Sequence, residues 1–401
     1  MAKIAFINSS FTIYEGTSGG AKHFRTWAQL LANEGHEVVV FSMGDSDKTV
    51  GVDGFKERII KCSRYPEEGF TPLRVADFLA LGAMGFRPTV EMMNRDRRLS
   101  DAVCDFNPDA IIVGGFVLYK IARRCRAKCR NARMLVAVDS PDQIYDSFKA
   151  LKQDSFLSRT KAVAGAVEKL LKGRYYRYNL GMYKATIEAA DAIAVPTAHE
   201  RDRVREEFPH YRKHIYIIPG IASHESKKRK GRNSTAIKRI LFTGVYDYPP
   251  NMEAIRLIEK VIAPHLPDKQ FLVAGRGVPK KKISNMTYMG TVRDVSEVVR
   301  SADVCIVPTP YAHGLQTKII DYLMEGKPVI GTTVAFRGYN IKDKLNAIVE
   351  DDINRFPDRI VELEKNPKLY KKISEGEAAV LKDFHPKAIT SKLLEALGLN
   401  G

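Results

Sequence analysis

The sequence has 401 residues, of which 44% are hydrophobic and 28% are charged, and this length is sufficient for two domains with separate cores. The formal net charge of +17 predicts attraction to anionic partners, meaning nucleic acid, anionic lipid or phosphorylated ligands. The longest apolar patch, VADFLALGAMGF, is interrupted by Asp77 and is shorter than the roughly 20 residues of a membrane span.

The first half of the sequence alternates apolar strand-like runs with amphipathic helical segments. The N-terminal run KIAFINS reads as a strand and not as a signal peptide. A glycine loop and a helix that ends at Gly35 follow, and EVVVFS is a second strand. Short continuous apolar runs of this kind suit parallel strands that are covered on both faces. Further predicted strands are DAIIVGG, RMLVAVDS, DAIAVPT and IYIIPG.

The same pattern starts again after a polar, basic stretch at about 223–236. The strands KRILFTG, KQFLVAG, DVCIVPT and KPVIGTT alternate with the helices NMEAIRLIEKVIAPHL and VSEVVRSA. We therefore predict an α/β protein with two Rossmann-like, doubly wound domains that face each other across a cleft. The predicted parts are an N-terminal domain at 1–220, a basic linker at 221–237, a C-terminal domain at 238–385, and a last helix at 386–401 that packs back on the first domain.

Two loops at predicted strand ends of the first domain are candidate binding sites. GTSGGAK contains Gly19, Gly20 and Lys22 and allows close approach to a phosphate or sugar, although an ordinary βα turn explains it equally well. VAVDSPDQIYD places Asp139 and Asp142 at a strand end, where a carboxylate is a candidate general base. Helix capping by Ser140 or Asp142 is the alternative.

The segment HGLQTKIIDYLMEGKPVIG follows a strand of the second domain and predicts a helix from about Leu315 to Glu325. Lys318 lies in its first turn, where a cation is unfavourable unless a negative ligand is bound. Asp321 lies one turn further on the same face and is placed to accept hydrogen bonds from sugar hydroxyls. A solvent-exposed pair of Lys318 with Asp321 is the alternative, and local spacing does not decide between the two. Arg276 in AGRG is a second candidate anion contact.

Two regions are strongly basic. RRCRAKCRNAR holds six cations and no acid, and KLLKGRYYRYNLGMYK mixes tyrosines with cations. Such a mixture suits a membrane interface or single-stranded nucleic acid, and a solvated helix with half-buried tyrosines is the alternative. The residues predicted to face a membrane are Lys172, Arg174, Tyr175, Tyr176 and Arg177.

The cysteines and acidic pairs do not predict a metal site. Five scattered cysteines indicate reduced thiols in a cytosolic protein. Cys125 and Cys129 have helical spacing but no histidine near them, so buried or idle thiols are favoured. Asp45 and Asp47 in GDSDK lie in a polar loop, where a solvated turn is favoured.

The whole chain resembles the GT-B glycosyltransferases, in particular the bacterial nucleotide-sugar transferases that build cell-surface polysaccharides. FTGVYDYPPNMEAIRLIEKVIAPHLPDKQFLVAGRG resembles the start of that family's donor domain, and GLQTKIIDYLMEGKPVIGT resembles its donor-binding helix. VDSPDQIYD resembles the strand end that bears the family's aspartate, and GGAKHFRTWAQLLANEGHEVVVFS its first βαβ unit. The donor-binding residues that this resemblance implies, besides Lys318 and Asp321, are His313, Gly314, Gln316, Thr317, Tyr246 and Arg276.

The sequence departs from this family at the donor helix. Retaining members carry two glutamates eight positions apart, and here these positions are His313 and Asp321. The usual Arg and Lys pair after the first donor-domain strand is absent from GVYDYPPN. Lys318 in their place resembles the inverting glucuronosyltransferase of xanthan assembly, in which a lysine at the matching position binds the nucleotide. That enzyme uses an aspartate of the N-terminal domain as base, which points to Asp139, with Asp142 as second choice.

We therefore predict a metal-independent, inverting transfer from a nucleoside-diphosphate sugar, a UDP-sugar such as UDP-glucuronate, to a lipid-linked or other saccharide acceptor. No cofactor is expected. The predicted location is the cytoplasm, peripheral to the inner face of the plasma membrane, with the anionic membrane surface as a partner. The alternatives are a nucleotide-sugar epimerase, a non-catalytic scaffold, and a protein that binds single-stranded nucleic acid, the last of which is disfavoured.

Overall fold

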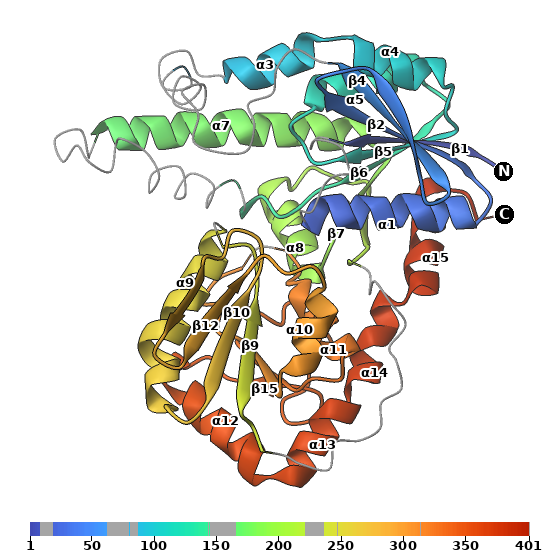
Figure 1. The fold of residues 1–401 in the computed structure, drawn as a ribbon. Coiled ribbons are helices and arrows are strands. Elements are labelled where there is room, and N and C mark those ends of the chain that lie inside the picture. The colour runs from blue at the N-terminus through green and yellow to red at the C-terminus, as the bar shows by residue number, and fades with distance from the viewer. Residues whose placement is uncertain are drawn as a thin grey trace. The chain divides into compact units, whose positions relative to one another are not determined.

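The computed structural model divides the chain into two compact α/β units (Figure 1). The first comprises Met1–Ile218 and Thr390–Gly401, and the second comprises Pro219–Ile389. Most of the predicted basic linker at 221–237 lies outside the described residues. The structure describes residues 1–8, 19–61, 80, 87–142, 144, 166–220, 236–246, 248–312 and 314–400, without the side chains of 19–22, 88–89 and 166–171.

The first unit is built on a sheet with the strand order β3-β4-β2-β1-β5-β6-β7-β8 among the described residues. All neighbouring strands are parallel except the antiparallel pair of β3 with β4. The elements are β1 (Lys3–Asn8), α1 (Gly19–Asn33), β2 (Glu37–Gly44), β3 (Lys48–Val52), β4 (Phe55–Lys61), α3 (Pro88–Arg95), α4 (Arg98–Asp105), β5 (Ala110–Gly114), α5 (Tyr119–Lys128), β6 (Arg133–Ala137), α7 (Ala166–Ala189), β7 (Ala192–Val195), α8 (Ala198–Glu207) and β8 (His214–Ile217).

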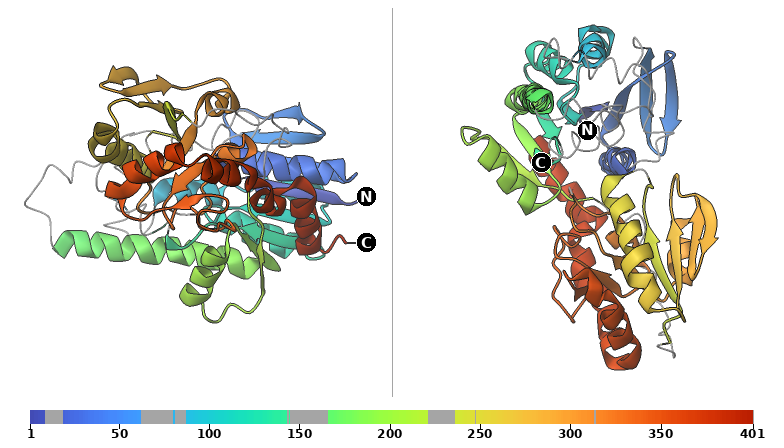
Figure 2. Two further views of the ribbon diagram at one scale, coloured as in Figure 1. Left: turned by 90° about the horizontal axis from the view of Figure 1, so that it is seen from below. Right: turned by 90° about the vertical axis from the view of Figure 1, so that its left-hand side faces the viewer.

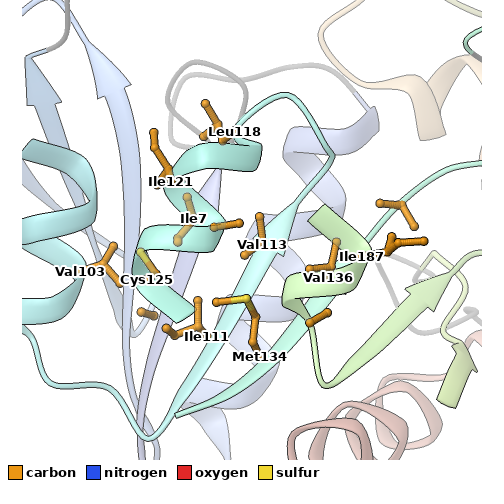
Figure 3. Close-up of a cluster of buried hydrophobic side chains, with 14 of the residues drawn as sticks. Ile7, Val103, Ile111, Val113, Leu118, Ile121, Cys125, Met134, Val136 and Ile187 are labelled. Atoms are coloured by element: carbon orange, nitrogen blue, oxygen red, sulfur yellow. The ribbon is translucent and has the colours of Figure 1, made fainter. Parts of the chain in front are cut away.

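The central strands of this sheet are buried on both faces, which explains their continuous apolar runs. On one face, alternate strand residues pack with α4, α5 and α7 in one hydrophobic cluster (Figure 3). On the other face lies α1, whose Phe24 ring comes so close to β5 that a Cβ at Gly114 would lie 2.8 Å from it. Strand residues of the clustered face include Ile7, Ile111, Val113, Met134 and Val136.

The second unit contains a sheet with the order β11-β12-β10-β9-β13-β14-β15 among the described residues, parallel except for the edge pair of β11 with β12 (Figures 1 and 2). Its elements are β9 (Arg239–Thr243), α9 (Pro249–Leu257), η3 (Ile258–Ile262), η4 (Ala263–His265), β10 (Gln270–Ala274), β11 (Lys280–Ile283), β12 (Met286–Gly290), α10 (Val295–Ser301), β13 (Val304–Val307), α11 (Lys318–Met324), β14 (Val329–Gly331), β15 (Ile348–Val349), η5 (Ile353–Arg355), α12 (Phe356–Lys365), α13 (Pro367–Glu375), α14 (Glu377–Leu381) and η6 (Lys382–Phe384).

Two hydrophobic clusters cover the two faces of this second sheet. One includes Phe242 and Ile306 and extends to α9, α12 and α13, whereas the other includes Leu241 and Cys305 and extends to α10, α11 and α14. Parallel strands between these layers bring their carboxyl ends to one edge, where α9 and α11 begin. Helix α15 (Pro386–Leu397) follows, and within the first unit the Arg133 side chain donates to the carbonyl of Ala396 at 2.8 Å.

The predicted α/β class with two doubly wound units and the ten predicted strands are confirmed, whereas two local expectations are wrong. The donor helix begins at Lys318 and not at Leu315, because the chain turns only at Thr317. Gly19 and Gly20 lie in the first turn of α1 and not in a loop. The hairpins β3–β4 and β11–β12 were not expected, because their exposed edge strands lack apolar runs.

Candidate active site

A glycine follows each of the strands β9 and β10, so the backbone at these two strand ends carries no side chain. Gly244 follows β9 and Gly275 follows β10. Gly275 has a φ of +151°, and a Cβ on it would lie 1.9 Å from the carbonyl oxygen of Gly244. A Cβ on Gly244 would lie 2.7 Å from the Asn251 side-chain nitrogen. Neither position accepts a side chain, so peptide groups are all that the two strand ends present here.

Lys318, the first residue of α11, is tied to this edge by a hydrogen bond. Its Nζ donates to Oδ1 of Asn251 at 2.6 Å, and the Asn251 Nδ2 donates to the carbonyl of Val245 at 2.9 Å. Asn251 is buried and belongs to α9. The side chain of one residue therefore joins the start of α11, the start of α9 and the end of β9.

The ammonium of Lys318 is also in contact with an aromatic ring. Nζ lies 4.1 Å from the centroid of Phe242, the penultimate residue of β9, which attracts a cation through the ring quadrupole. Burial lowers the pKa of Lys318 to about 7. The hydrogen bond and the ring contact are both with uncharged groups, and neither compensates the charge. The arrangement favours binding of an anion at the ammonium.

The remaining predicted donor residues that the structure describes lie in α11, in the loop before it, and in the loops after β9 and β10. Gly314 and Gln316 are buried just before α11, and the Gln316 carbonyl accepts a hydrogen bond from Tyr339 at 2.7 Å. The Tyr246 N–H donates to the carbonyl of Arg276 at 2.9 Å, which joins the loops after β9 and β10. Thr317 and the Arg276 side chain are exposed, and Asp321 is half-buried in the first turn of α11. His313 lies outside the described residues.

Asn251, Phe242 and Tyr322 are site residues that sequence reasoning missed. The hydroxyl of Tyr322, one residue after Asp321, accepts from the N–H of Thr243 at 2.7 Å and is 2.9 Å from its Oγ1. This buried pair fixes the end of β9 against α11. The local signal available for Asn251 was a polar residue directly after the two prolines that begin α9.

In the first unit, Asp139 and Asp142 follow β6 but differ in their surroundings. Asp139 is exposed, and its main-chain carbonyl accepts a hydrogen bond from the buried Tyr183 at 2.9 Å. Asp142 is half-buried and pairs with Arg203 of α8, whose Nη2 and Nε lie 2.8 and 3.0 Å from Oδ1. The main-chain N–H of Asp142 donates to Oγ of Ser140, as the capping alternative required.

The ion pair makes Asp142 a poor proton acceptor. Burial acts to raise the pKa of Asp142, but hydrogen bonds and charge from Arg203 outweigh it and hold the pKa below its ordinary value. A general base for an alcohol needs to be free to take a proton near neutral pH. These contacts count against Asp142 as the base, and the role of Asp139 stays a prediction.

The basic, tyrosine-bearing segment forms part of α7, and one prediction for it is wrong. Tyr175 is 5% exposed and packs in the core, so it does not face outward. Lys172 and Arg177 are exposed, and Arg174 and Tyr176 are half-buried, with the Lys172 ammonium 5.5 Å from the Tyr176 ring centroid. The ring of Tyr175 packs in the hydrophobic cluster of the first unit. This agrees with the alternative of a helix whose tyrosines are partly buried.

Among the residues that the structure describes, no group of three or more His, Cys, Asp or Glu side chains is arranged to hold a metal ion. The carboxylate of Asp47 accepts from the Lys61 N–H at 2.7 Å, which fits the solvated turn. Within the same residues, no helix has both the length and the apolar character needed to cross a membrane.

Family profiles match both units of the chain. The profile of Glycosyltransferase Family 4 matches residues 17–221, more than half of the sequence. The chain belongs to this family. The profile of the glycosyl transferases of group 1 matches residues 237–366, which include Lys318 and Asn251. This family 4 member is therefore an enzyme, a glycosyltransferase. Comparison with curated protein sequences gives no significant match.

Solved structures with the same fold extend over nearly the whole family 4 chain. Sucrose-phosphate synthase from Thermosynechococcus elongatus has a TM-score of 0.70 at 15% identity, with 98% of each chain covered. An E. coli structure described as trehalose-6-phosphate bound with UDP-2-fluoro glucose has a TM-score of 0.64 at 12% identity, with 99% of each chain covered. A trehalose-6-phosphate synthase described as transferring with retention has a TM-score of 0.65 at 12% identity, with 98% of each covered. These likenesses confirm the GT-B fold.

Proposed function

We propose that this glycosyltransferase takes its sugar from a nucleoside-diphosphate sugar held at Lys318. The observation that carries the proposal is the ammonium of Lys318, partly buried among uncharged partners beside the bare peptide groups of Gly244 and Gly275. A diphosphate placed there would compensate the charge of the ammonium. The N–H groups of Gly244 and Gly275 already donate to the carbonyls of Ala274 and Gly290, so what these glycines offer a ligand is room for close approach. One of the similar structures is described as bound to UDP-2-fluoro glucose, which supports the same class of donor.

Lys318 would act mainly on the leaving group. As the bond between the sugar and the diphosphate breaks, negative charge grows on the departing oxygen, and a cation already in place stabilises that charge. Removal of such a contact costs a few kcal/mol of transition-state stabilisation, which corresponds to about 100-fold in turnover. Asp321, half-buried in the same turn, is assigned to sugar or ribose hydroxyls.

We assign the acceptor to the first unit and the general base to Asp139. In the proposed single displacement, Asp139 takes the proton of an acceptor hydroxyl and the oxygen attacks the anomeric carbon with inversion. The pairing of Asp142 with Arg203 supports this choice between the two carboxylates. Because a similar structure is described as working with retention, the anomeric configuration of the product is the direct test of the base.

The proposed acceptor is a lipid-linked saccharide at the cytosolic membrane face, and the proposed donor is a UDP-sugar such as UDP-glucuronate. The resemblance to xanthan assembly suggests both, together with a role in cell-surface polysaccharide synthesis. The net charge of +17 and the exposed cations of α7 and α5 support contact with an anionic membrane. High salt should then release the enzyme from vesicles that contain anionic lipid.

Calorimetry tests the donor site directly. We expect UDP and UDP-sugars to bind the wild type, and the Lys318→Met variant to lose affinity by at least about tenfold. Lys371→Met is the matched control, because Lys371 is an exposed lysine of α13 and its substitution should leave binding unchanged. Equal affinity in wild type and Lys318→Met would rule out the proposed site.

Two other experiments test the alternative functions. Isomerisation of the donor without acceptor would identify an epimerase. Tight binding of single-stranded RNA at moderate salt would identify a nucleic-acid-binding protein.

A further inference from the structure

Three of the cysteines gather at one place in the first unit, a feature that the proposed transfer does not use. Cys104 is in the last turn of α4, Cys125 is in α5, and Cys129 directly follows α5. The Sγ atoms of Cys104 and Cys129 are 3.0 Å apart. Two helices that end side by side bring together thiols that are 25 positions apart in the sequence.

The three thiols differ in their access to solvent. Cys125 is 0% exposed and packs in the hydrophobic cluster with Val103 and Ile111 (Figure 3). Cys104 and Cys129 are both free thiols that are partly exposed at the rim of this cluster. A small oxidant from solvent therefore reaches Cys104 and Cys129 and not Cys125.

The surroundings favour a thiolate at Cys104. Hydrogen bonds from the Cys125 and Cys129 thiols, helped by the charge of Lys128, outweigh burial and lower the pKa of Cys104. Burial and the neighbouring Cys104 raise the pKa of Cys129. The thiolate is the nucleophilic form of cysteine, so the pair has one attacking and one resolving thiol.

We propose that Cys104 and Cys129 form a peroxide-reactive dithiol, a modification site separate from the transferase chemistry. The Cys104 thiolate attacks one oxygen of hydrogen peroxide, and with a proton this gives a sulfenic acid and water. The Cys129 thiol then displaces the hydroxyl group, which forms the disulfide and a second water. Peroxide is reduced by two electrons and the two thiols are oxidised by two electrons. The sulfur atoms need to approach by about 1 Å to reach the disulfide length.

Clustered thiols can also bind a metal ion. The three cysteines are not arranged to hold one, since the described residues contain no metal-ligand group of three or more. The disulfide, unlike a sulfenic acid on Cys104 alone, would also affect stability. It would join the ends of α4 and α5 and restrict the unfolded chain between positions 104 and 129, which raises resistance to unfolding.

The test uses the full chain with Cys62→Ser, because Cys62 lies outside the described residues. After treatment with hydrogen peroxide, we expect the folded protein to lose two titratable thiols and to yield one linked pair of peptides that contain Cys104 and Cys129. Dithiothreitol should restore both thiols. The melting temperature should rise on oxidation and fall again on reduction. The buried Cys305 is the internal reference and should stay reduced.

Two variants separate the roles of the thiols. Cys129→Ala should stop the reaction at a Cys104 sulfenic acid, which dimedone traps, whereas Cys125→Ser should still form the linked pair. The proposal is overturned if the folded wild type keeps all of its thiols under peroxide, or if the linked pair contains Cys125. It is also overturned if Cys305 oxidises as fast as Cys104.

Discussion

The amine of Lys318 is 2.6 Å from the side-chain oxygen of Asn251, although the two residues are 67 positions apart and lie in the first turns of different helices. The contact fixes the amine over Phe242 and beside Gly244. Asn251 is thus a positioning residue for the proposed donor site. The Nδ2 of the same side chain donates to the carbonyl of Val245. A substitution of Asn251 therefore affects both Lys318 and the loop after β9.

Substitution of Asn251 should weaken donor binding through Lys318. Asn251→Ala removes the acceptor that holds the amine, and we expect the Kd for UDP to rise by about tenfold. Asn251→Asp should be worse, because a carboxylate pairs with the amine and repels the diphosphate. Calorimetry with UDP measures both. If Asn251→Asp bound UDP as tightly as the wild type, Lys318 would not contact the diphosphate.

The affinity for UDP should depend on pH through Lys318. In the free enzyme burial lowers the pKa of Lys318 to about 7, and a bound diphosphate favours the protonated form. Protons are therefore taken up on binding above pH 7, and affinity should fall by up to about tenfold for each pH unit above 7. Calorimetric titrations at pH 7, 8 and 9 check this slope.

Lys318→Arg is the matched variant for the pH experiment. A guanidinium keeps its charge across this range, so the pH dependence of UDP binding should be lost even if affinity at pH 7 is reduced. A slope that persists in Lys318→Arg would show that another group titrates.

The same lysine should make the ligand-free enzyme less stable at neutral pH. Its pKa is lowered in the folded state, so between pH 7 and about 10.4 the unfolded chain binds more protons. The contribution of Lys318 to the free energy of unfolding therefore rises as the pH increases from 7 to about 10.4. Lys318→Met removes the penalty and should stabilise the free protein by on the order of 1 kcal/mol, after discounting for the partial exposure of the side chain.

Urea unfolding of Lys318→Met and wild type at pH 7 and pH 9.5 measures this difference. The gain should be larger at pH 7 and should shrink toward pH 9.5. Greater stability combined with weaker UDP binding would mark Lys318 as a residue kept for function. A variant that is less stable at both pH values would indicate a structural role instead.

The central strands of both sheets could be predicted from the sequence because burial on both faces demands unbroken apolar runs, as in Ile4–Ile7 and Ile111–Val113. The edge strand β11 could not, because its Lys280, Lys281 and Lys282 are all exposed and resemble a solvated loop. Fold class thus follows from the interior of the sheets, whereas their edges depend on pairing that no local pattern encodes.

The candidate site was predictable only in part for a related reason. Lys318 and Asp139 could be proposed from the sequence because each follows a predicted strand, and ligands of doubly wound sheets bind at the carboxyl ends of the strands. The partners of Lys318 and Asp142 are distant in sequence: Asn251 is 67 positions from Lys318, and Arg203 is 61 positions from Asp142. No spacing rule reaches so far, so the ion pair that counts against Asp142 as the base could not be predicted from the sequence.

Gly275 should tolerate no side chain. It has a φ of +151°, and a Cβ would lie 1.9 Å from the Gly244 carbonyl oxygen, so Gly275→Ala forces the ends of β9 and β10 apart. We expect a loss of at least about 3 kcal/mol in the free energy of unfolding. Gly277→Ala is the control: its φ is +75° and its Cβ would meet Tyr246 at 3.6 Å. This control should lose only about 1 kcal/mol, as measured by urea unfolding.

The two aspartates after β6 should respond differently to amidation. Asp139→Asn removes the proposed base and should lower kcat by about 100-fold or more, with little change in the Kd for UDP. Asp142→Asn weakens the pair with Arg203 and should reduce stability by about 1–3 kcal/mol, while the turnover of the folded fraction falls less. Turnover with a saccharide acceptor and urea unfolding separate the two effects. A larger loss of kcat in Asp142→Asn than in Asp139→Asn would move the base to Asp142, and a product with retained configuration would exclude both.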